Sequence, residues 1–337
     1  MKLPADKVNR LRGSFEGRRV LVTGGAGFIG GHLCDALLGV GASVTVLDDL
    51  SNSTLEHLAG LVELEPDRVR FVQGSVLDDE AVGDASEGAG LCFHLAAVGS
   101  VPRSVEYPQR SWSVNATGTL RVLEAMRANK AERVVIASSS SVYGDDPALP
   151  RRESAMPSPV SPYAASKLAA ETLGAVWSRT YGLSTVSLRL FNVFGPRQPA
   201  DSAYAAAVPA FARRLLAAEQ PVIYGDGSVT RDFTAVADAV LAFLLAGASA
   251  TPLSGEVFNI GSGRATSIAD LAELIAQRAG LPGANALHEP ARAGDVPHSL
   301  ADISRAREAL GYEPTAALEA ALDETLRWYR SVLARTA

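Results

Sequence analysis

A glycine-rich segment, TGGAGFIG at residues 23–30, places the tightest constraint on how this chain can fold. It follows an apolar, strand-like run and precedes a stretch with apolar residues at helical spacing. Gly24 permits a tight turn, Gly27 lets the backbone approach a diphosphate, and Gly30 lets the helix pack closely on the strand. The unpaired N–H groups that begin such a helix attract anions. The segment therefore predicts a diphosphate cradle between a strand and a helix.

Strand-like and helix-like segments alternate along the chain as far as about residue 195. Continuous apolar strands separated by helices are typical of a parallel sheet covered on both faces. We expect an α/β protein with a Rossmann-type doubly wound sheet in residues 1–190, to which segments near 230–262 return. Residues 191–337 are expected to form a smaller C-terminal α/β substrate domain.

Composition narrows the class of partner. The chain of 337 residues is 47% hydrophobic and carries a formal net charge of −6, which argues against a nucleic-acid surface. The N-terminus lacks a signal-peptide pattern, and the most apolar segment carries Asp238 and is too short to span a membrane. Cys34 and Cys92 lie in apolar stretches and suit buried, reduced thiols rather than a metal site. We expect a cytoplasmic protein that binds a small molecule.

Asp48 indicates which dinucleotide the cradle would bind. It ends the next strand-like run, SVTVLDD, eighteen residues after Gly30. A carboxylate there can accept both hydroxyls of the adenosine ribose and would repel a 2′-phosphate. The pattern predicts NAD as the cofactor.

A second cluster, SPYAASK, places Tyr163 and Lys167 one helical turn apart on the same face of a predicted helix. A free tyrosine has a pKa near ~10 and is a poor base at neutral pH, but a neighbouring ammonium group favours the phenolate. The polar run IASSSSVYG, which contains Ser139, ends an apolar strand about twenty residues earlier. Ligands bind at the carboxyl ends of strands in such sheets, so we expect these groups at one site.

The chain resembles the extended short-chain dehydrogenases/reductases of the nucleotide-sugar epimerase/dehydratase group, and bacterial UDP-N-acetylglucosamine 4-epimerases most of all. The resemblance is carried, over nearly the whole chain, by TGGAGFIG, HLAA, SVYG, YAASK, RLFNVFGP, GDGSVTRDF and GDVPHSLADISRA. It implies that Tyr163 is the catalytic base, that Lys167 binds the nicotinamide ribose and that Ser139 hydrogen-bonds the sugar hydroxyl. It also implies that Asn115 helps to place the helix of Lys167, and that His94 is structural.

The same resemblance implies two sets of binding residues. The predicted cofactor contacts are Gly24, Gly27, Phe28, Ile29, Gly30, Asp48, Ser75, Val76, Ala96, Asn115, Tyr163 and Lys167. The predicted substrate contacts are Ser100, Ser139, Ser140, Asn192, Arg231, Arg292, Asp295 and Ser299. Ser75 stands where the family usually has an aspartate near adenine, so either the affinity for NAD is lower or Asp78 compensates.

Three positions narrow the reaction and the substrate. Ser140 and Ser141 stand where the family's 4,6-dehydratases carry carboxylates, which leaves reversible oxidation at a single carbon, that is, 4-epimerisation. Ser299 is small where epimerases restricted to UDP-glucose and UDP-galactose have a bulky tyrosine. The expected reaction is therefore interconversion of UDP-GlcNAc and UDP-GalNAc.

Alternatives remain at this point. A UDP-glucuronate 4-epimerase would need a cation for the sugar carboxylate, for which Arg103 or Arg197 is a candidate, and a UDP-glucose 4-epimerase is a further possibility. A non-catalytic NAD-binding regulator would be expected to lack Ser139, Tyr163 or Lys167. By resemblance, the helix after Asn115 and the helix of Tyr163 would pair with those of a second copy as a four-helix bundle, giving a homodimer.

Overall fold

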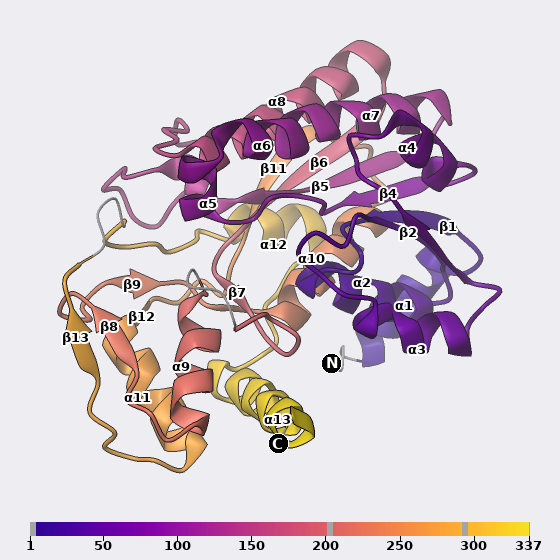
Figure 1. The fold of residues 1–337 in the computed structure, drawn as a ribbon. Helices are drawn as coiled ribbons and strands as arrows, with labels where there is room; N and C mark the ends of the chain where they lie inside the picture. The colour runs from indigo at the N-terminus through magenta and orange to yellow at the C-terminus, as the bar shows by residue number, and fades with distance from the viewer. Residues whose placement is uncertain (1–4, 201–204, 292–295, 337) are drawn as a thin grey trace.

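The computed structural model describes residues 5–200, 205–291 and 296–336, and it is built around a seven-stranded parallel sheet (Figure 1). The strand order is β11-β6-β5-β4-β1-β2-β3. The strands are β1 (Arg19–Thr23), β2 (Ser43–Asp48), β3 (Val69–Gln73), β4 (Leu91–His94), β5 (Arg133–Ser139), β6 (Ser184–Leu190) and β11 (Ser254–Ile260). The predicted doubly wound parallel sheet is confirmed.

The strand order reverses direction between β1 and β4, which pair in parallel with Thr23 opposite His94. From β1 the chain winds outward through β2 and β3, and then returns to β4 and continues through β5 to β6. The crossover connections therefore leave the two neighbouring strands in opposite directions and open a crevice beyond their carboxyl ends. The glycine segment follows β1 and enters this crevice.

Helices cover both faces of the sheet, as Figure 1 shows. One face carries α4 (Asp79–Ser86), α7 (Gly118–Ala128) and α8 (Pro162–Tyr181), with α5 (Val101–Glu106) and α6 (Pro108–Trp112) packed on α8. The other face carries α2 (Phe28–Gly39), α10 (Val236–Ala248) and α12 (Ser304–Leu310), flanked by α1 (Ala5–Phe15) and α3 (Glu56–Leu64). The apolar helix α10 has ten of its residues buried, because it packs on β4, β5 and β6 and is flanked by α1, α2 and α12.

A smaller group of elements lies beside the carboxyl edge of the sheet, at the lower left of Figure 1. Its helices are α9 (Ala207–Leu216), α11 (Ile268–Ala279) and α13 (Leu318–Thr336), which pack on one another around a separate apolar cluster. Its short strands form three pairs: β7 (Val193–Phe194) with β10 (Thr234–Ala235), β9 (Thr230–Arg231) with β12 (Thr266–Ser267), and β8 (Val222–Tyr224) with β13 (Leu287–Glu289).

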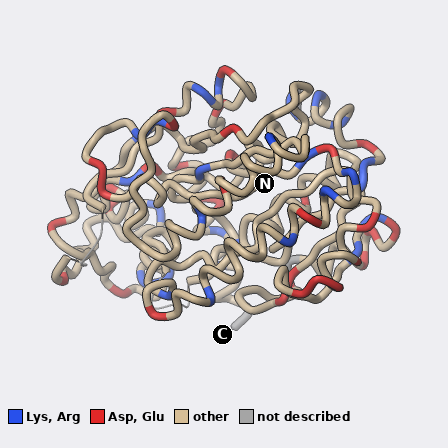
Figure 2. Tube along the Cα trace, turned by 90° about the horizontal axis from the view of Figure 1, so that it is seen from above, with Lys and Arg blue, Asp and Glu red and all other residues tan. Residues whose placement is uncertain are grey.

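The surface carries charges of both signs. Figure 2 shows Lys and Arg interspersed with Asp and Glu along the trace. Many of these charges form exposed ion pairs, such as Arg70 with Asp84 and Arg307 with Glu313. No helix in the described part of the chain has both the length and the apolar character needed to cross a bilayer.

Arg133, at the start of β5, links this strand to the start of β6 and to the carboxyl end of α10. Its guanidinium is buried and donates hydrogen bonds to the carbonyl oxygens of Ala246, Ser249 and Thr251 at 2.8–2.9 Å. Its Nε donates to Ser184 Oγ, at the start of β6, over 3.1 Å. A cation beside the carbonyl groups that end a helix, here α10, satisfies acceptors that have no partner within that helix.

Arg133→Met is expected to lower the free energy of unfolding by about 2–4 kcal/mol, because buried carbonyl groups lose a charged donor. Urea denaturation followed by circular dichroism measures the change. Arg70→Met is the matched control: this side chain is half-exposed, so its ion pair with Asp84 should contribute less than about 1 kcal/mol. Equal effects of the two substitutions would contradict the role given to Arg133.

Candidate active site and dinucleotide cradle

The turn after β1 requires glycine at two positions. Gly24 has a φ of +71°, and a Cβ there would lie 2.7 Å from the backbone nitrogen of Ala96, which follows β4. A Cβ on Gly30 would lie 2.1 Å from the carbonyl oxygen of Gly24. The first glycine thus brings the turn against the end of β4, and the second brings α2 against the turn.

The first turn of α2 is open to an anion. Gly27 is the N-cap residue, and no side chain caps the helix. The first turn contains no acidic residue, and Phe28 and Ile29 are half-buried there. Free N–H groups at the start of a helix, close to a backbone that no Cβ obstructs, suit the diphosphate of a dinucleotide. The residues present therefore fit that group.

Asp48 lies at the end of β2, beside the glycine turn. Its Oδ2 accepts a hydrogen bond from the N–H of Ala26 over 3.0 Å, and its Oδ1 accepts from the N–H of Leu50 and from Ser53 Oγ. The carboxylate thus fixes the glycine turn to the loop after β2. A carboxylate offers about four acceptor positions, so it can still accept a ribose hydroxyl.

The residues predicted to lie near the adenine of the cofactor follow β3. Ser75 Oγ accepts a hydrogen bond from the N–H of Leu77 over 3.2 Å, and Val76 is buried against Gly118. Asp78 is the N-cap residue of α4 and accepts hydrogen bonds from the N–H groups of Glu80 and Ala81. The structure therefore gives Asp78 a local task in capping this helix.

Tyr163 and Lys167 lie on α8, next to the end of β5. Lys167 Nζ donates a hydrogen bond to the carbonyl oxygen of Ala137 over 2.8 Å, and the side chain is only 6% exposed. Burial lowers the pKa of Lys167 to about 8, although the nearby Glu171 opposes this shift. Burial also raises the pKa of Tyr163, and its hydrogen bond with Ser139 lowers it. Ser139, Tyr163 and Lys167, predicted to act together, are thus close to one another.

The serines after β5 form a compact polar turn. Ser139 caps a short 3-10 helix, η2 (Ser140–Tyr143), and its Oγ accepts hydrogen bonds from the N–H and the hydroxyl of Ser141 over 3.2 and 2.9 Å. Ser140 is half-buried. These side chains can donate and accept hydrogen bonds, but none of them is an acid or a base at neutral pH.

A directed chain of hydrogen bonds runs behind the site. Thr23 Oγ1 donates to His94 Nδ1, His94 Nε2 donates to Thr119 Oγ1, and Thr119 donates to the carbonyl oxygen of Asn115, over 2.6–2.9 Å. These directions follow because Thr119 gives its one hydroxyl proton to Asn115 and so must accept from His94 Nε2, which leaves Nδ1 of the neutral ring to accept from Thr23. Burial and the Lys167 charge lower the pKa of His94 to about 3, so the ring is neutral and serves as a relay between β1, β4 and α7.

Asn115 lies in a π-helical turn, Ser113–Thr117, and joins two segments of the site. Its side chain bonds both the N–H and the carbonyl oxygen of Val98, over 2.8 and 3.3 Å, and donates to Ser166 Oγ over 2.9 Å. Ser166 in turn donates to the carbonyl oxygen of Tyr163 over 2.7 Å. A π-helical turn is a frequent device for aiming a side chain at a functional site.

Ser104 is a further contact of α8 that the sequence did not reveal. Its buried hydroxyl accepts a hydrogen bond from the N–H of Tyr163 over 3.0 Å and donates to the carbonyl oxygen of Val101. Together with Ser161, the N-cap residue, it fixes the first turn of α8. A lone serine carries no spacing signal, so only the packing of α5 on α8 identifies it.

The predicted substrate residues fall into three groups. Arg231 and Ser299 are brought together across 68 positions of sequence, because the N–H of Ser299 donates to the carbonyl oxygen of Thr230 over 3.1 Å. Ser100 caps α5 and Asn192 is exposed after β6. Arg292 and Asp295 lie outside the residues that the structure describes.

Arg231 is held in the same loop cluster. Its Nη1 donates to the carbonyl oxygens of Thr230 and Pro297 over 2.9 and 3.3 Å. The two arginines suggested for a sugar carboxylate are engaged elsewhere. Arg197 pairs with Asp35 on α2 over 2.7 Å, and Arg103 donates to Asn52 over 2.8 Å. Over the described residues, no cluster of His, Cys, Asp and Glu is suited to hold a metal ion.

Comparison with known proteins places this site in a family. Residues 20–261 match the model of the NAD dependent epimerase/dehydratase family. A UDP-glucose 4-epimerase of Mycolicibacterium smegmatis is 41% identical over 93% of this chain and 99% of its own length.

Solved structures agree with this match. The UDP-N-acetylglucosamine 4-epimerase of Methanobrevibacter ruminantium M1, in complex with UDP-N-acetylmuramic acid, is 36% identical with a TM-score of 0.88, over 94% of this chain and 99% of that one. The UDP-glucose 4-epimerase of Thermotoga maritima, with UDP-glucose, is 36% identical with a TM-score of 0.87 over the same shares. The chain therefore belongs to the NAD dependent epimerase/dehydratase family and is a nucleotide-sugar epimerase whose cofactor is NAD.

Proposed function

We propose that this enzyme interconverts UDP-GlcNAc and UDP-GalNAc by inverting carbon 4 of the sugar. The observation that carries the proposal is the grouping of Ser139, Tyr163 and Lys167 without a carboxylate at positions 140 and 141, together with the small Ser299 beside Arg231. The first part supports the reaction type and the second supports the sugar.

Each residue of the group has a step in this proposal. Tyr163 removes the proton of the 4-hydroxyl and later returns it, while Ser139 hydrogen-bonds the same oxygen. The ammonium of Lys167 favours the phenolate of Tyr163 and donates a hydrogen bond to the cofactor ribose. NAD held in the glycine cradle would supply reversible hydride transfer at carbon 4 of the sugar. No net oxidation results, so the cofactor does not need to leave.

The rest of the site supports binding of the two ligands. We propose that Gly24, Gly27 and Gly30 receive the NAD diphosphate at the start of α2 and that Asp48 binds the adenosine ribose. Arg231 is proposed to bind the UDP diphosphate, since a guanidinium can bond two phosphate oxygens at once. On this division, residues 1–190 with the returning segments near 230–262, which include α10 and β11, serve the cofactor, and the rest of residues 191–337 serves the sugar nucleotide.

The choice of sugar rests on Ser299. A hydroxymethyl side chain leaves room for a 2-acetamido group, which a tyrosine at this position would obstruct. The relative from M. ruminantium is named for UDP-N-acetylglucosamine, whereas those from M. smegmatis and T. maritima are named for UDP-glucose. UDP-glucose is thus the main rival substrate. The engagement of Arg197 with Asp35 and of Arg103 with Asn52 disfavours UDP-glucuronate.

The purified enzyme should convert UDP-GlcNAc to UDP-GalNAc without added NAD. Separate incubations with UDP-GlcNAc, UDP-glucose and UDP-glucuronate, resolved by anion-exchange chromatography and proton NMR, test this directly. An active Tyr163→Phe variant would contradict the role of the phenol, for which loss of a general base predicts a rate lower by about 10²–10⁴-fold. Epimerisation of UDP-glucose alone would overturn the proposed substrate, and a keto-deoxy product would overturn the reaction.

Ser299→Tyr should change the sugar preference without disturbing the chemistry. We expect kcat/KM for UDP-GlcNAc to fall by about 10–200-fold, while that for UDP-glucose changes little, because steric exclusion from a pocket operates on this scale. Ser299→Ala is the matched control and should keep both activities. Unchanged turnover of UDP-GlcNAc by the tyrosine variant would show that position 299 does not face the acetamido group.

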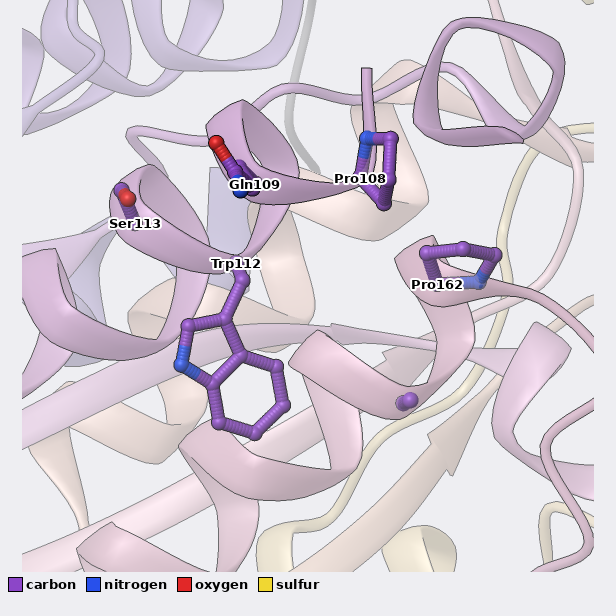
Figure 3. Close-up of a pocket in the computed structure, with 6 residues that line it drawn as sticks. Pro108, Gln109, Trp112, Ser113 and Pro162 are labelled. Atoms are coloured by element: carbon purple, nitrogen blue, oxygen red, sulfur yellow. The ribbon is translucent and has the colours of Figure 1, made fainter. Parts of the chain in front are cut away.

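We also propose a homodimer formed through the outer helices on the α8 face of the sheet. A hollow between α6 and α8 is lined by Pro108, Gln109, Trp112, Ser113, Pro162 and Ala165 (Figure 3). Trp112 is 51% exposed, and Val176 and Tyr181 on α8 are also exposed. Apolar groups gathered on a surface mark contacts with other molecules, and the family resemblance favours a second copy.

Trp112→Glu should convert a dimer to a monomer, since it would place a charge in the apolar contact. Sedimentation velocity over a range of protein concentrations measures the change. Leu64→Glu is the control, because Leu64 is 79% exposed at the end of α3, far from α6 in the chain, and its replacement should leave the dimer intact. A wild-type protein that sediments as a monomer throughout would refute this assembly.

A further inference from the structure

A buried ion pair lies behind the catalytic lysine. Glu171 on α8 receives two hydrogen bonds from Arg189 on β6, from Nε to Oε1 over 2.9 Å and from Nη2 to Oε2 over 2.8 Å. The two residues are 5% and 3% exposed. This geometry resembles that of surface pairs such as Arg307 with Glu313, whose side chains are about half-exposed. The two pairs differ in burial, and water screens the charges of a buried pair poorly.

Glu171 continues the stripe of Tyr163 and Lys167 along α8. The three residues stand at i, i+4 and i+8, so they lie on one face of the helix. Consecutive residues of β5 meet this face. Ser139 bonds Tyr163, and the carbonyl oxygen of Ala137 accepts from Lys167 Nζ.

Ser138 completes the contact between β5 and α8. Its buried hydroxyl donates to Oε1 of Glu171, the oxygen that also accepts from Nε of Arg189. Glu171 is therefore bonded to β5 and β6 at once. A rotation of α8 that moved Tyr163 or Lys167 away from β5 would have to break these bonds.

The titratable groups near the α8 stripe come from several elements. His94 on β4 is neutral, as its lowered pKa shows, and Tyr163 on α8 and Tyr143 on η2 have raised pKa values and are neutral when protonated. Arg189 lies with its guanidinium carbon 4.7 Å from the ring centroid of Tyr143. Glu171 acts against the effect of burial on Lys167 and favours its ammonium form.

We propose that Glu171 and Arg189 are positioning residues of the catalytic site: the carboxylate fixes α8 against β5 and keeps Lys167 protonated, and the guanidinium balances the charge of the carboxylate. The proposal rests on the proposed function in that Lys167 must be an ammonium group to favour the phenolate of Tyr163. A buried ion pair rarely stabilises a fold more than apolar packing of the same volume would. We therefore attribute the role of Glu171 and Arg189 to their charges. The consequence is electrostatic: without the carboxylate, Lys167 loses the anion that opposes the effect of its burial and should lose its proton at a lower pH.

The lysines of this chain are Lys2, Lys7, Lys130 and Lys167, so each can be resolved by NMR after selective labelling. With ε-¹³C-lysine, the shift of the Lys167 carbon reports its protonation, and its absence in Lys167→Met identifies the signal. In Glu171→Gln the titration midpoint should fall by about one pH unit relative to the wild type. Glu313→Gln, which breaks a two-bonded Arg–Glu pair at the surface, should leave it unchanged.

A second variant covers the case in which Glu171→Gln does not fold because it leaves Arg189 buried and unpaired. Glu171→Gln/Arg189→Gln removes both charges, and the Lys167 midpoint should still lie below that of the wild type, because the carboxylate that favours the ammonium form is gone. Circular dichroism establishes folding, and Lys167 in an unfolded chain would titrate near the ordinary value of about 10.4, which makes that state recognisable.

The pH dependence of kcat is a second, independent measurement. The alkaline limb of the kcat profile for the best substrate should move to lower pH in Glu171→Gln and not in Glu313→Gln, whereas a merely structural loss would lower kcat at all pH values equally. Coincident Lys167 midpoints in the wild type, Glu171→Gln and the double variant would overturn the inference. Shifted midpoints in a protein that epimerises no UDP-sugar would uphold it and refute the proposed function instead, because the NMR titration needs no substrate.

Discussion

The contact between the end of β5 and one face of α8 is the constraint on which the site depends. Three successive residues of the strand, 137 to 139, meet three successive turns of the helix, at Lys167, Glu171 and Tyr163. Beyond Ser139 the strand ends in the 3-10 turn, and the helix begins at Pro162.

The crevice between β1 and β4 connects this contact to the cofactor. The glycine turn leaves β1 there, and the hydrogen-bond chain through His94 leads from β1 across β4 to Asn115. Asn115 then holds Ser166 on α8. The glycine turn and the face of α8 that carries Tyr163 and Lys167 are thus linked through β1 and β4. The loops that carry Arg231 and Ser299 belong to the smaller group of elements and are joined to each other through Thr230.

The sequence predicts the elements whose signal is local and misses those that depend on packing. Apolar strands and the glycine spacing predict the doubly wound sheet, because both patterns arise within one βα unit. Tyr163 and Lys167 could be predicted for the same reason, because their spacing places them one helical turn apart. Glu171 extends their spacing and could have been found by continuing it. Ser104, Ser138 and Arg189 could not, because their roles depend on which elements become neighbours in space.

The central claim is that a hydride leaves carbon 4 of the sugar and returns to the same carbon. UDP-GlcNAc that carries deuterium at carbon 4 tests it, with mass spectrometry and NMR of both epimers at equilibrium in ordinary water. Transfer to a resident cofactor and back predicts that the product retains its deuterium at carbon 4 and that none is found at another carbon. Replacement of that deuterium by solvent hydrogen would mean that the carbon–hydrogen bond is broken by proton abstraction, and would contradict the mechanism.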